Sequence, residues 1–364
     1  MASYIARRLL LMIPTLFGIL LINFLIIQAA PGGPVERTLA QLQGLGASMG
    51  AGGAVGGGGD LASAGGGHGP GGYRGSQGLS AELVAEIEQQ YGFDKPPAER
   101  FWKMITDFAS FDLGDSFYRD IPVLDLVLEK LPVSLSLGLW STLLIYLIAV
   151  PLGIRKALAP GSRFDVWSSG VIIVAYAIPG FLFALLLIIL FAGGSYWQWF
   201  PMQGLTSEDF ASLSAWGKLL DYAHHMVLPT VCLTLGGLAT LTLFTRNSFL
   251  EELQKQYVLT ARAKGADERR VLLGHVFRNA MLILIAGLPA TLFGILFTGA
   301  FLIEIIFNLD GLGLLSYESV INRDYPVIFG TLFLFTLMGM LLRLLGDLCY
   351  RLVDPRIDFA RSAS

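Results

Sequence analysis

The residues with most scope for chemistry lie in one charged segment, Tyr257–Asn279, which reads YVLTARAKGADERRVLLGHVFRN. It separates two apolar segments, Met226–Phe244 and Met281–Phe307. Each is long enough to cross a bilayer, because a spanning helix takes roughly 20 apolar residues. The charged segment has the positive excess of a cytoplasmic loop, carried by Arg262, Lys264, Arg269, Arg270 and Arg278. We therefore expect a loop held close to the membrane at both ends.

The middle of this segment predicts a short helix–turn–helix. Ala261–Lys264 is a helix-forming run that Gly265 stops, and a second helix can begin after Asp267. Two short helices beside a membrane would form a rigid, protruding surface. The alternative is a solvated loop whose charges only fix the topology.

Motifs for catalysis and nucleotide binding are absent from the sequence. It holds no G-x-x-x-x-G-K-[ST] stretch, so we expect no ATP site on this chain. It also holds no H-E-x-x-H or G-x-S-x-G motif, which argues against an intramembrane enzyme. His224, His225 and His275 are expected to be solvated or locally hydrogen-bonded. No catalytic residue, cofactor site or metal site is predicted on the chain.

Ionisable residues are almost absent from the centres of the apolar segments. Glu304, Arg343 and Asp347 lie near segment ends. An ion-coupled carrier should place such residues in the bilayer core, so this pattern argues against one. That carrier stays a distant alternative, because sodium sites can be built from backbone carbonyls of broken helices.

The composition is that of a membrane protein. Of 364 residues, 54% are hydrophobic and 15% are charged, against about 25% charged in soluble domains. The chain has no basic tract that would indicate a nucleic-acid partner. Cys232 and Cys349 are expected to be small buried residues rather than a disulfide.

The predicted fold class is all-α and polytopic, with six transmembrane helices in the lipid bilayer. The first apolar run is longer than the 7–15 residues of a secretory signal core, so we interpret it as a helix. The predicted spans are Leu9–Ala30, Val133–Ile154, Val166–Ala192, Met226–Phe244, Met281–Phe307 and Pro326–Asp347.

The chain divides into four predicted regions. Residues 1–30 form the first transmembrane helix, and residues 31–131 form a large periplasmic insertion. Within the insertion, 44–78 is glycine-rich and predicted to be flexible, and 80–120 is predicted to be helical with a break at Pro96-Pro97. Residues 132–350 form a five-helix core with a cytoplasmic loop at 245–280, and 351–364 form a cytoplasmic tail.

Charge sidedness predicts that both termini are cytoplasmic. The short outer loops hold only Lys218 and Arg323. The inner segments hold many more cations, as the positive-inside rule requires: Arg7, Arg8, Arg155, Lys156, Arg163, Arg246, Lys255, Arg262, Lys264, Arg269, Arg270, Arg278, Arg351, Arg356 and Arg361.

Prolines recur in the inner segments and could bend helices around a translocation path: Pro151, Pro179, Pro229 and Pro289. The alternative is that proline is simply frequent in membrane helices. Small residues permit close helix contact or could line a pore: Gly236, Gly237, Ala239, Gly287, Gly294 and Gly299.

The TARAKG run and the segment after it resemble the ATPase-docking loop of ABC-importer permeases. That loop starts Glu-Ala-Ala, has a glycine four residues after the second alanine, and ends Leu-Pro. Ala261 and Gly265 match, whereas the family's other positions are occupied by Leu259, Thr260 and Phe277-Arg278. These departures are similar to the peptide-importer branch.

Further segments resemble permeases of the oligopeptide, dipeptide and nickel type. They are Arg7–Leu9 with Pro14, Pro31–Pro34, Phe111–Ser116, Leu131–Leu135 with Leu137–Leu139, Gly311–Gly313, Asn322–Pro326 and Asp354–Arg356. The glycine-rich insertion and Ser162–Ser169 look most like the first permease of Yej-type systems, which are linked to uptake of peptides and of the peptide-nucleotide antibiotic microcin C.

This resemblance implies a methionine-importer-like permease fold in a bacterial inner membrane. It also implies a second, related permease subunit, ATP-binding subunits that carry ATP and Mg, and a periplasmic peptide-binding protein. A nickel or other small-solute permease is the alternative. The implied docking residues are Tyr257, Thr260, Ala261, Arg262, Ala263, Lys264, Gly265, His275 and Arg278.

Overall fold

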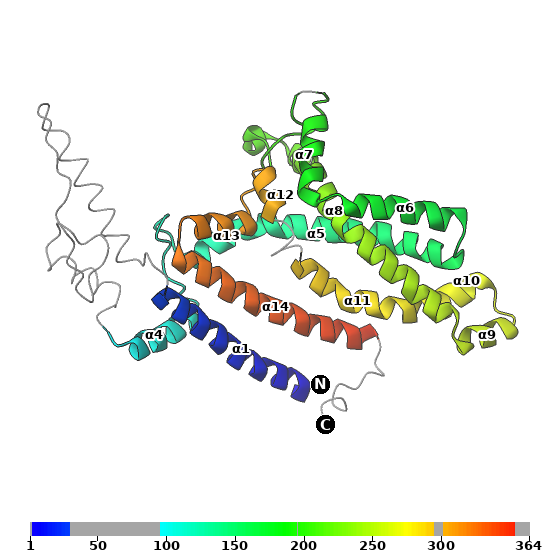
Figure 1. Cartoon of the computed structure of the whole chain (residues 1–364), viewed down its shortest axis with the longest axis horizontal. Helices are drawn as coiled ribbons and strands as arrows, with labels where there is room; N and C mark the ends of the chain where they lie inside the picture. Colours follow the sequence, from blue (N-terminus) through cyan, green and yellow to red (C-terminus); the bar gives the residue numbers. More distant parts are fainter. Residues whose placement is uncertain (1, 30–94, 195, 295–300, 354–364) are drawn as a thin grey trace, which may run out of the picture.

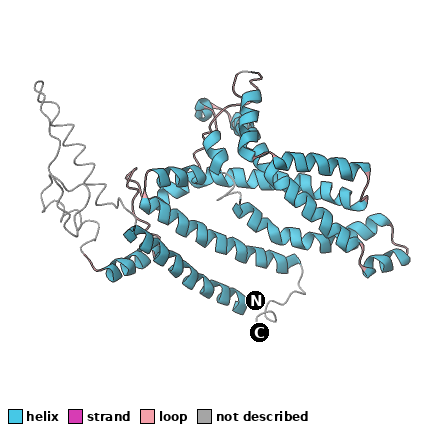
Figure 2. Ribbon diagram, viewed as in Figure 1, coloured by secondary structure: helices cyan, strands magenta, loops and turns pink. Residues whose placement is uncertain are grey.

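The computed structural model describes residues 2–29, 95–194, 196–294 and 301–353. Helices make up most of this part (Figure 2), joined by loops and one isolated β-bridge between Asp115 and Pro122. The glycine-rich segment 44–78 and the predicted helical stretch from 80 to 94 lie outside the described residues. The later part of the insertion contains α4 (Pro97–Ala109), which begins at the predicted proline break.

Five described helices are long and apolar enough to span a membrane. The pair α6 (Arg163–Ala177) and α7 (Gly180–Phe191), bent by 92°, gives a sixth span when it is counted as one. The all-α, multi-span fold class is thus confirmed (Figure 1), with five or six spans among the described residues. The five long helices are α1 (Ala2–Ala29), α5 (Val123–Leu158), α8 (Ala215–Leu253), α11 (Phe277–Gly294, extended in the span by the preceding turns) and α14 (Tyr325–Val353).

The core of the bundle is the packing of α5 against α8. Small residues let the two backbones approach closely. A Cβ added to Gly153 would lie 2.5 Å from Thr245 Cβ, and one added to Gly237 would lie 2.4 Å from Ile145 Cδ1. α11 packs on α14 and α8, and α1 packs on α14.

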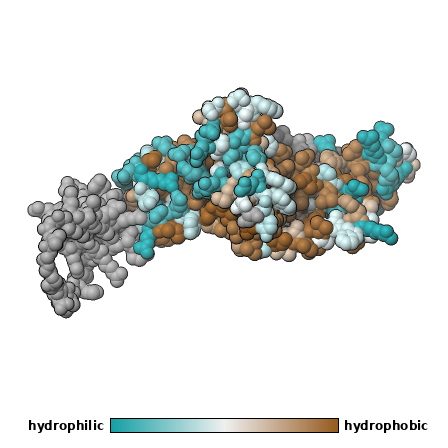
Figure 3. All heavy atoms as spheres, turned by 90° about the horizontal axis from the view of Figure 1, so that it is seen from above, coloured by the Kyte–Doolittle hydropathy of each residue, from teal (hydrophilic) through white to brown (hydrophobic). Residues whose placement is uncertain are grey.

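The start of α1 and the end of α14 lie together. Tyr4 Oη donates to Asp347 Oδ2 at 2.8 Å, and Arg8 Nη2 lies 3.1 Å from the same oxygen. The outer face of α1 exposes large apolar side chains such as Leu10 and Ile13. Figure 3 shows hydrophobic side chains along the body of the bundle and hydrophilic ones at its right-hand end.

Several predicted boundaries were wrong. α5 and α8 begin earlier than the apolar runs, because their first turns carry polar residues that a hydropathy criterion rejects. The predicted loop Asn308–Tyr325 contains α13 (Leu312–Ile321). Of the predicted span Met281–Phe307, the structure describes the part in α11 (Phe277–Gly294) and the part in α12 (Phe301–Ile306), and residues 295–300 lie outside the described residues.

Candidate functional site

The charged loop Tyr257–Asn279, which is predicted to be cytoplasmic and which we call the inner loop, folds as a helix–turn–helix. α9 (Gln256–Ala263) is followed by a turn, by α10 (Glu268–Arg270) and by a π-helical turn, Val271–Val276, that continues into α11. Gly265 takes φ +82°, a conformation that glycine adopts without a Cβ penalty. Its N–H donates to Arg262 O at 2.9 Å, and the Ala266 N–H donates to Ala261 O at 3.2 Å. These bonds close the end of α9.

A hydrophobic cluster fastens the loop to the bundle. Val258, Val271 and Val276 are fully buried against Phe249 of α8 and Ala157 of α5. Fully burying one such side chain contributes roughly 1.5–3 kcal/mol. Ser248 Oγ also donates to Ala280 O at 2.8 Å, which ties α8 to α11. The loop is therefore a packed extension of α5, α8 and α11.

An ion pair closes the turn from outside. Arg262 Nε and Nη2 donate to the two carboxylate oxygens of Glu268 at 2.8 and 2.9 Å. The hydrogen bond with Glu268 raises the pKa of Arg262. Both side chains are exposed, so the pair orders the turn and adds little stability.

The junction between α8 and α9 has its own polar contacts. Tyr257 Oη donates to Glu252 Oε2 at 2.7 Å, and Lys255 Nζ donates to Glu252 Oε1 at 2.5 Å. Burial raises the pKa of Tyr257, and the hydrogen bond that Lys255 donates to Glu252 raises the pKa of Lys255. The phenol therefore stays protonated and the amine stays charged at neutral pH.

Most of the predicted docking residues are exposed. Tyr257 and Ala261 are half-buried, so they support the loop. The exposed ones are Thr260, Arg262, Ala263, Lys264, Gly265, His275 and Arg278. Two apolar side chains that sequence reasoning missed are also exposed there, Leu259 at 59% and Leu273 at 55%. The one sequence feature that could have identified them is a leucine within a charged segment that is expected to face solvent.

A cavity of about 420 Å³ opens between α7, α8, α11 and α12. Small residues predicted to matter, Gly236, Gly237 and Gly294, line it together with Cys232 and Ile303. Of the prolines, only Pro179 marks a break in the chain direction, between α6 and α7.

The other three prolines lie inside continuous helices: Pro151, Pro229 and Pro289. None of the four lines this cavity. The structure therefore does not bring the prolines together around it.

A buried ionic cluster joins α5, α6 and α8 near the inner loop. Asp165 lies between two cations: Lys156 Nζ is 3.0 Å from Oδ1, and Arg246 Nη2 is 2.9 Å from Oδ2. Lys156 Nζ also donates to Ser168 Oγ and Ser169 Oγ at 2.8 Å each. Sequence reasoning placed Lys156 in an inner loop, but its side chain is fully buried.

The histidines at the outer end are locally hydrogen-bonded, as expected. His224 Nε2 lies 2.6 Å from Trp199 O, and His225 Nδ1 lies 2.9 Å from Asp221 O. Among the described residues, no three His, Cys, Asp or Glu side chains are grouped to hold a metal ion. Both cysteines are free; Cys232 is buried, but Cys349 is exposed, contrary to expectation.

Comparisons with known proteins agree on one family. The profile for the binding-protein-dependent transport system inner membrane component matches residues 149–359. The chain is 57% identical, over 99% of both chains, to the peptidoglycan transport system permease protein YejB of Agrobacterium fabrum. It is 55% identical, again over 99% of both chains, to the inner membrane ABC transporter permease protein YejB of Escherichia coli O157:H7.

More distant relatives extend the comparison. The oligopeptide transport system permease protein AppB of Bacillus subtilis is 32% identical, over 99% of this chain and 100% of its own length. The inward-facing MetNI methionine ABC transporter gives a TM-score of 0.49 at 18% identity, over 63% of this chain and 97% of that one. The family profile and the near-full-length relatives carry the assignment. The chain belongs to the inner membrane components of binding-protein-dependent transport systems, as a multi-pass permease subunit of an ABC importer and not an enzyme.

Proposed function

We propose that this permease imports peptides or peptide-bearing compounds across the inner membrane. The substrate class rests on similarity, over nearly the full length of the chain, to permeases named for peptidoglycan and oligopeptide transport. A substrate with a peptide moiety is common to both names. Microcin C, which joins a peptide to a nucleotide, falls in the same class.

We further propose that the inner loop docks an ATP-binding subunit that carries ATP and Mg. The exposed helix–turn–helix supports this role, because it is stiffened internally and packed on α5, α8 and α11. Closure of the ATPases would then move these helices as a unit and shift the permease between two packed states. Exposed Leu259 and Leu273 would supply the apolar contact. The exposed cations of the loop, Arg262, Lys264 and Arg278, would supply charge complementarity.

The remaining partners follow from the same proposal. A second, related permease would complete the translocation path. The residues of α7, α8, α11 and α12 that line the cavity would form one wall of this path. A periplasmic peptide-binding protein would deliver substrate at the outer end, where α4 and α13 lie (Figure 1). Both termini would then be cytoplasmic, since the docking loop and the start of α1 lie toward the same end of the bundle.

Uptake by cells lacking the gene, with and without the gene restored, tests the proposal. Labelled peptides of two to eight residues, a peptidoglycan stem peptide, microcin C and nickel ions are each supplied. We expect restored uptake of at least one peptide-bearing compound, abolished by depletion of ATP. Restored nickel uptake alone would favour the metal alternative, and uptake that follows an ion gradient without ATP would contradict the importer proposal.

A further inference from the structure

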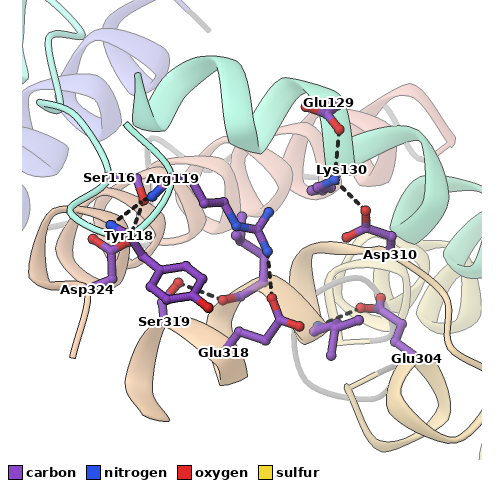
Figure 4. A network of polar contacts seen from close by, with 12 residues as sticks. Ser116, Tyr118, Arg119, Glu129, Lys130, Glu304, Asp310, Glu318, Ser319 and Asp324 are labelled. Atoms are coloured by element: carbon purple, nitrogen blue, oxygen red, sulfur yellow. Dashed lines mark hydrogen bonds and ion pairs between the residues drawn. The ribbon is translucent and has the colours of Figure 1, made fainter. Parts of the chain in front are cut away.

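A buried carboxylate at the outer end has no role in the function proposed above. Glu304 of α12 is 0% exposed. Ser134 Oγ of α5 donates to its Oε1 at 2.7 Å, and the Leu314 N–H of α13 donates to its Oε2 at 2.9 Å. Figure 4 shows Glu304 within the set of polar contacts at this end of the bundle. Sequence reasoning placed it near the end of a span, where an exposed carboxylate would be ordinary.

The carboxylate of Glu304, which lies on α12, caps the first turn of α13. The first N–H groups of a helix have no partner within the helix, and the positive end of the helix dipole favours a carboxylate. Here the Leu314 N–H bonds to Glu304, and the Leu312 N–H donates to Ser134 Oγ at 2.8 Å. Ser134 therefore accepts from α13 and donates to Glu304, so one hydroxyl links three helices.

The glycines of the G-L-G motif make room for this cap. A Cβ on Gly311 would lie 2.6 Å from both carboxylate oxygens of Glu304. A Cβ on Gly313 would lie 2.9 Å from Glu304 Oε2 and 2.8 Å from Phe301 Cα. Both contacts are closer than real Cβ atoms approach, so any other residue at either position would expel the carboxylate or shift α12.

The cap sits directly behind one wall of the cavity. Leu302 and Ile303, the two residues before Glu304, line the cavity between α7, α8, α11 and α12. We propose that Glu304 is a positioning residue, which fixes this outer wall by tying α12 to α13 and α5. The inference rests on the membership of the permease family and not on the substrate class.

Thiol labelling of the assembled transporter tests this role. The parent carries C232S, C349S and L302C, and a membrane-impermeant maleimide is the probe. We expect E304A to change the labelling rate at position 302 by about tenfold, because two buried donors lose their acceptor. Transport per ATP hydrolysed should fall in parallel, while ATPase activity and subunit content stay within about twofold of the parent. The matched control is E318A on α13, whose partly exposed carboxylate pairs with Arg119 of the loop before α5.

Conservative variants keep the test decisive. E304Q retains the size of the side chain but replaces one acceptor oxygen by an amide donor, so it should change the rate in the same direction by a smaller factor. The effects of S134A and E304A on the labelling rate should be less than additive in the double variant, because one hydrogen bond joins the two side chains.

A labelling rate in both E304A and E304Q within about twofold of the parent would overturn the inference, as would an equal change in E318A. If E304A does not accumulate, E304Q decides alone. The labelling needs no substrate, so it is informative whether or not peptide uptake is found.

Discussion

The inner loop and the outer helix α13 are both short helical structures between spans, but they are held differently. The inner turn is closed by neighbours in the sequence: Arg262 pairs with Glu268 across Gly265. α13 is held by residues remote in the sequence, since Ser116 donates to Asp324 at 2.5 Å and Lys130 pairs with Asp310. The turn of the inner loop therefore depends on contacts within the loop itself, whereas α13 is fixed by contacts with the rest of the bundle.

The backbone of the two regions differs in the same sense. The left-handed turn of the inner loop falls on glycine. At the outer end, non-glycine residues take such conformations on both sides of α13, Asn308 at φ +47° and Arg323 at φ +54°. A left-handed non-glycine residue costs roughly 1–2 kcal/mol, so tertiary contacts must hold these turns. The outer end stores strain that the inner loop avoids.

The largest expected effect is that of Gly265→Pro on transport. Proline fixes φ near −65° and removes the N–H that donates to Arg262 O. The turn cannot form, so co-purification of an ATPase and ATP-driven uptake should both fall by about 100-fold or more. The permease should still insert and unfold at the parent temperature, because the turn lies outside the spans. Gly170→Ala is the control, since a Cβ there meets nothing within 4 Å.

Asp324→Ala should have the next largest effect, on stability rather than docking. It leaves the Ser116 hydroxyl and the Phe117 N–H without their buried acceptor. Each loss costs about 1–3 kcal/mol, so thermal unfolding in nanodiscs should occur well below the parent temperature. Asp112→Ala, an exposed change in the loop that carries Ser116, should unfold like the parent. Equal unfolding temperatures for Asp324→Ala and Asp112→Ala would mean that the buried contacts of Asp324 do not hold the outer end together.

Leu259→Asp should weaken docking without changing the fold. The side chain is 59% exposed and makes no part of the buried cluster. Burying an unpaired neutral polar group costs about 1–3 kcal/mol and a charge costs more, so the affinity for the ATPase should fall about tenfold or more at constant permease stability. Gln254→Ala, an exposed change at the end of α8, is the control. Undiminished affinity in Leu259→Asp would remove this residue from the docking surface.

The smallest effect belongs to Glu268→Ala. An exposed ion pair contributes about 0.2–1 kcal/mol, so transport should fall by a few-fold at most, and more at low salt than at high salt. Uptake measured at two ionic strengths checks this. A loss as large as that of Gly265→Pro would mean that the pair, and not the glycine, determines the turn.

The inner loop was predictable from the sequence because its determinants are local. Gly265 after a helix-forming run indicates a cap, and the charges around it indicate a solvent-facing loop. The six spans follow from uninterrupted apolar length in the same way. Near-neighbour chemistry is all that either inference needs.

The outer end was not predictable, because remote residues determine it. α13 was assigned to the loop between the last two predicted spans; Gly311 and Gly313 in fact accommodate Glu304, which lies on another helix. Lys156 was counted as a loop cation, and only the packing of α5 on α6 and α8 shows that it is buried. Leu259 was noticed only as a departure from a motif, because exposure is a property of the folded loop.

Affinity purification of the chain from its native membrane tests the central claim most directly. The parent and Gly265→Pro are purified side by side, and the co-purifying chains are identified and assayed for ATPase activity. We expect a second permease and an active ATPase to co-purify with the parent, and the second permease without the ATPase to co-purify with Gly265→Pro. An ATPase retained in full by Gly265→Pro would contradict the assignment of this loop as the docking site.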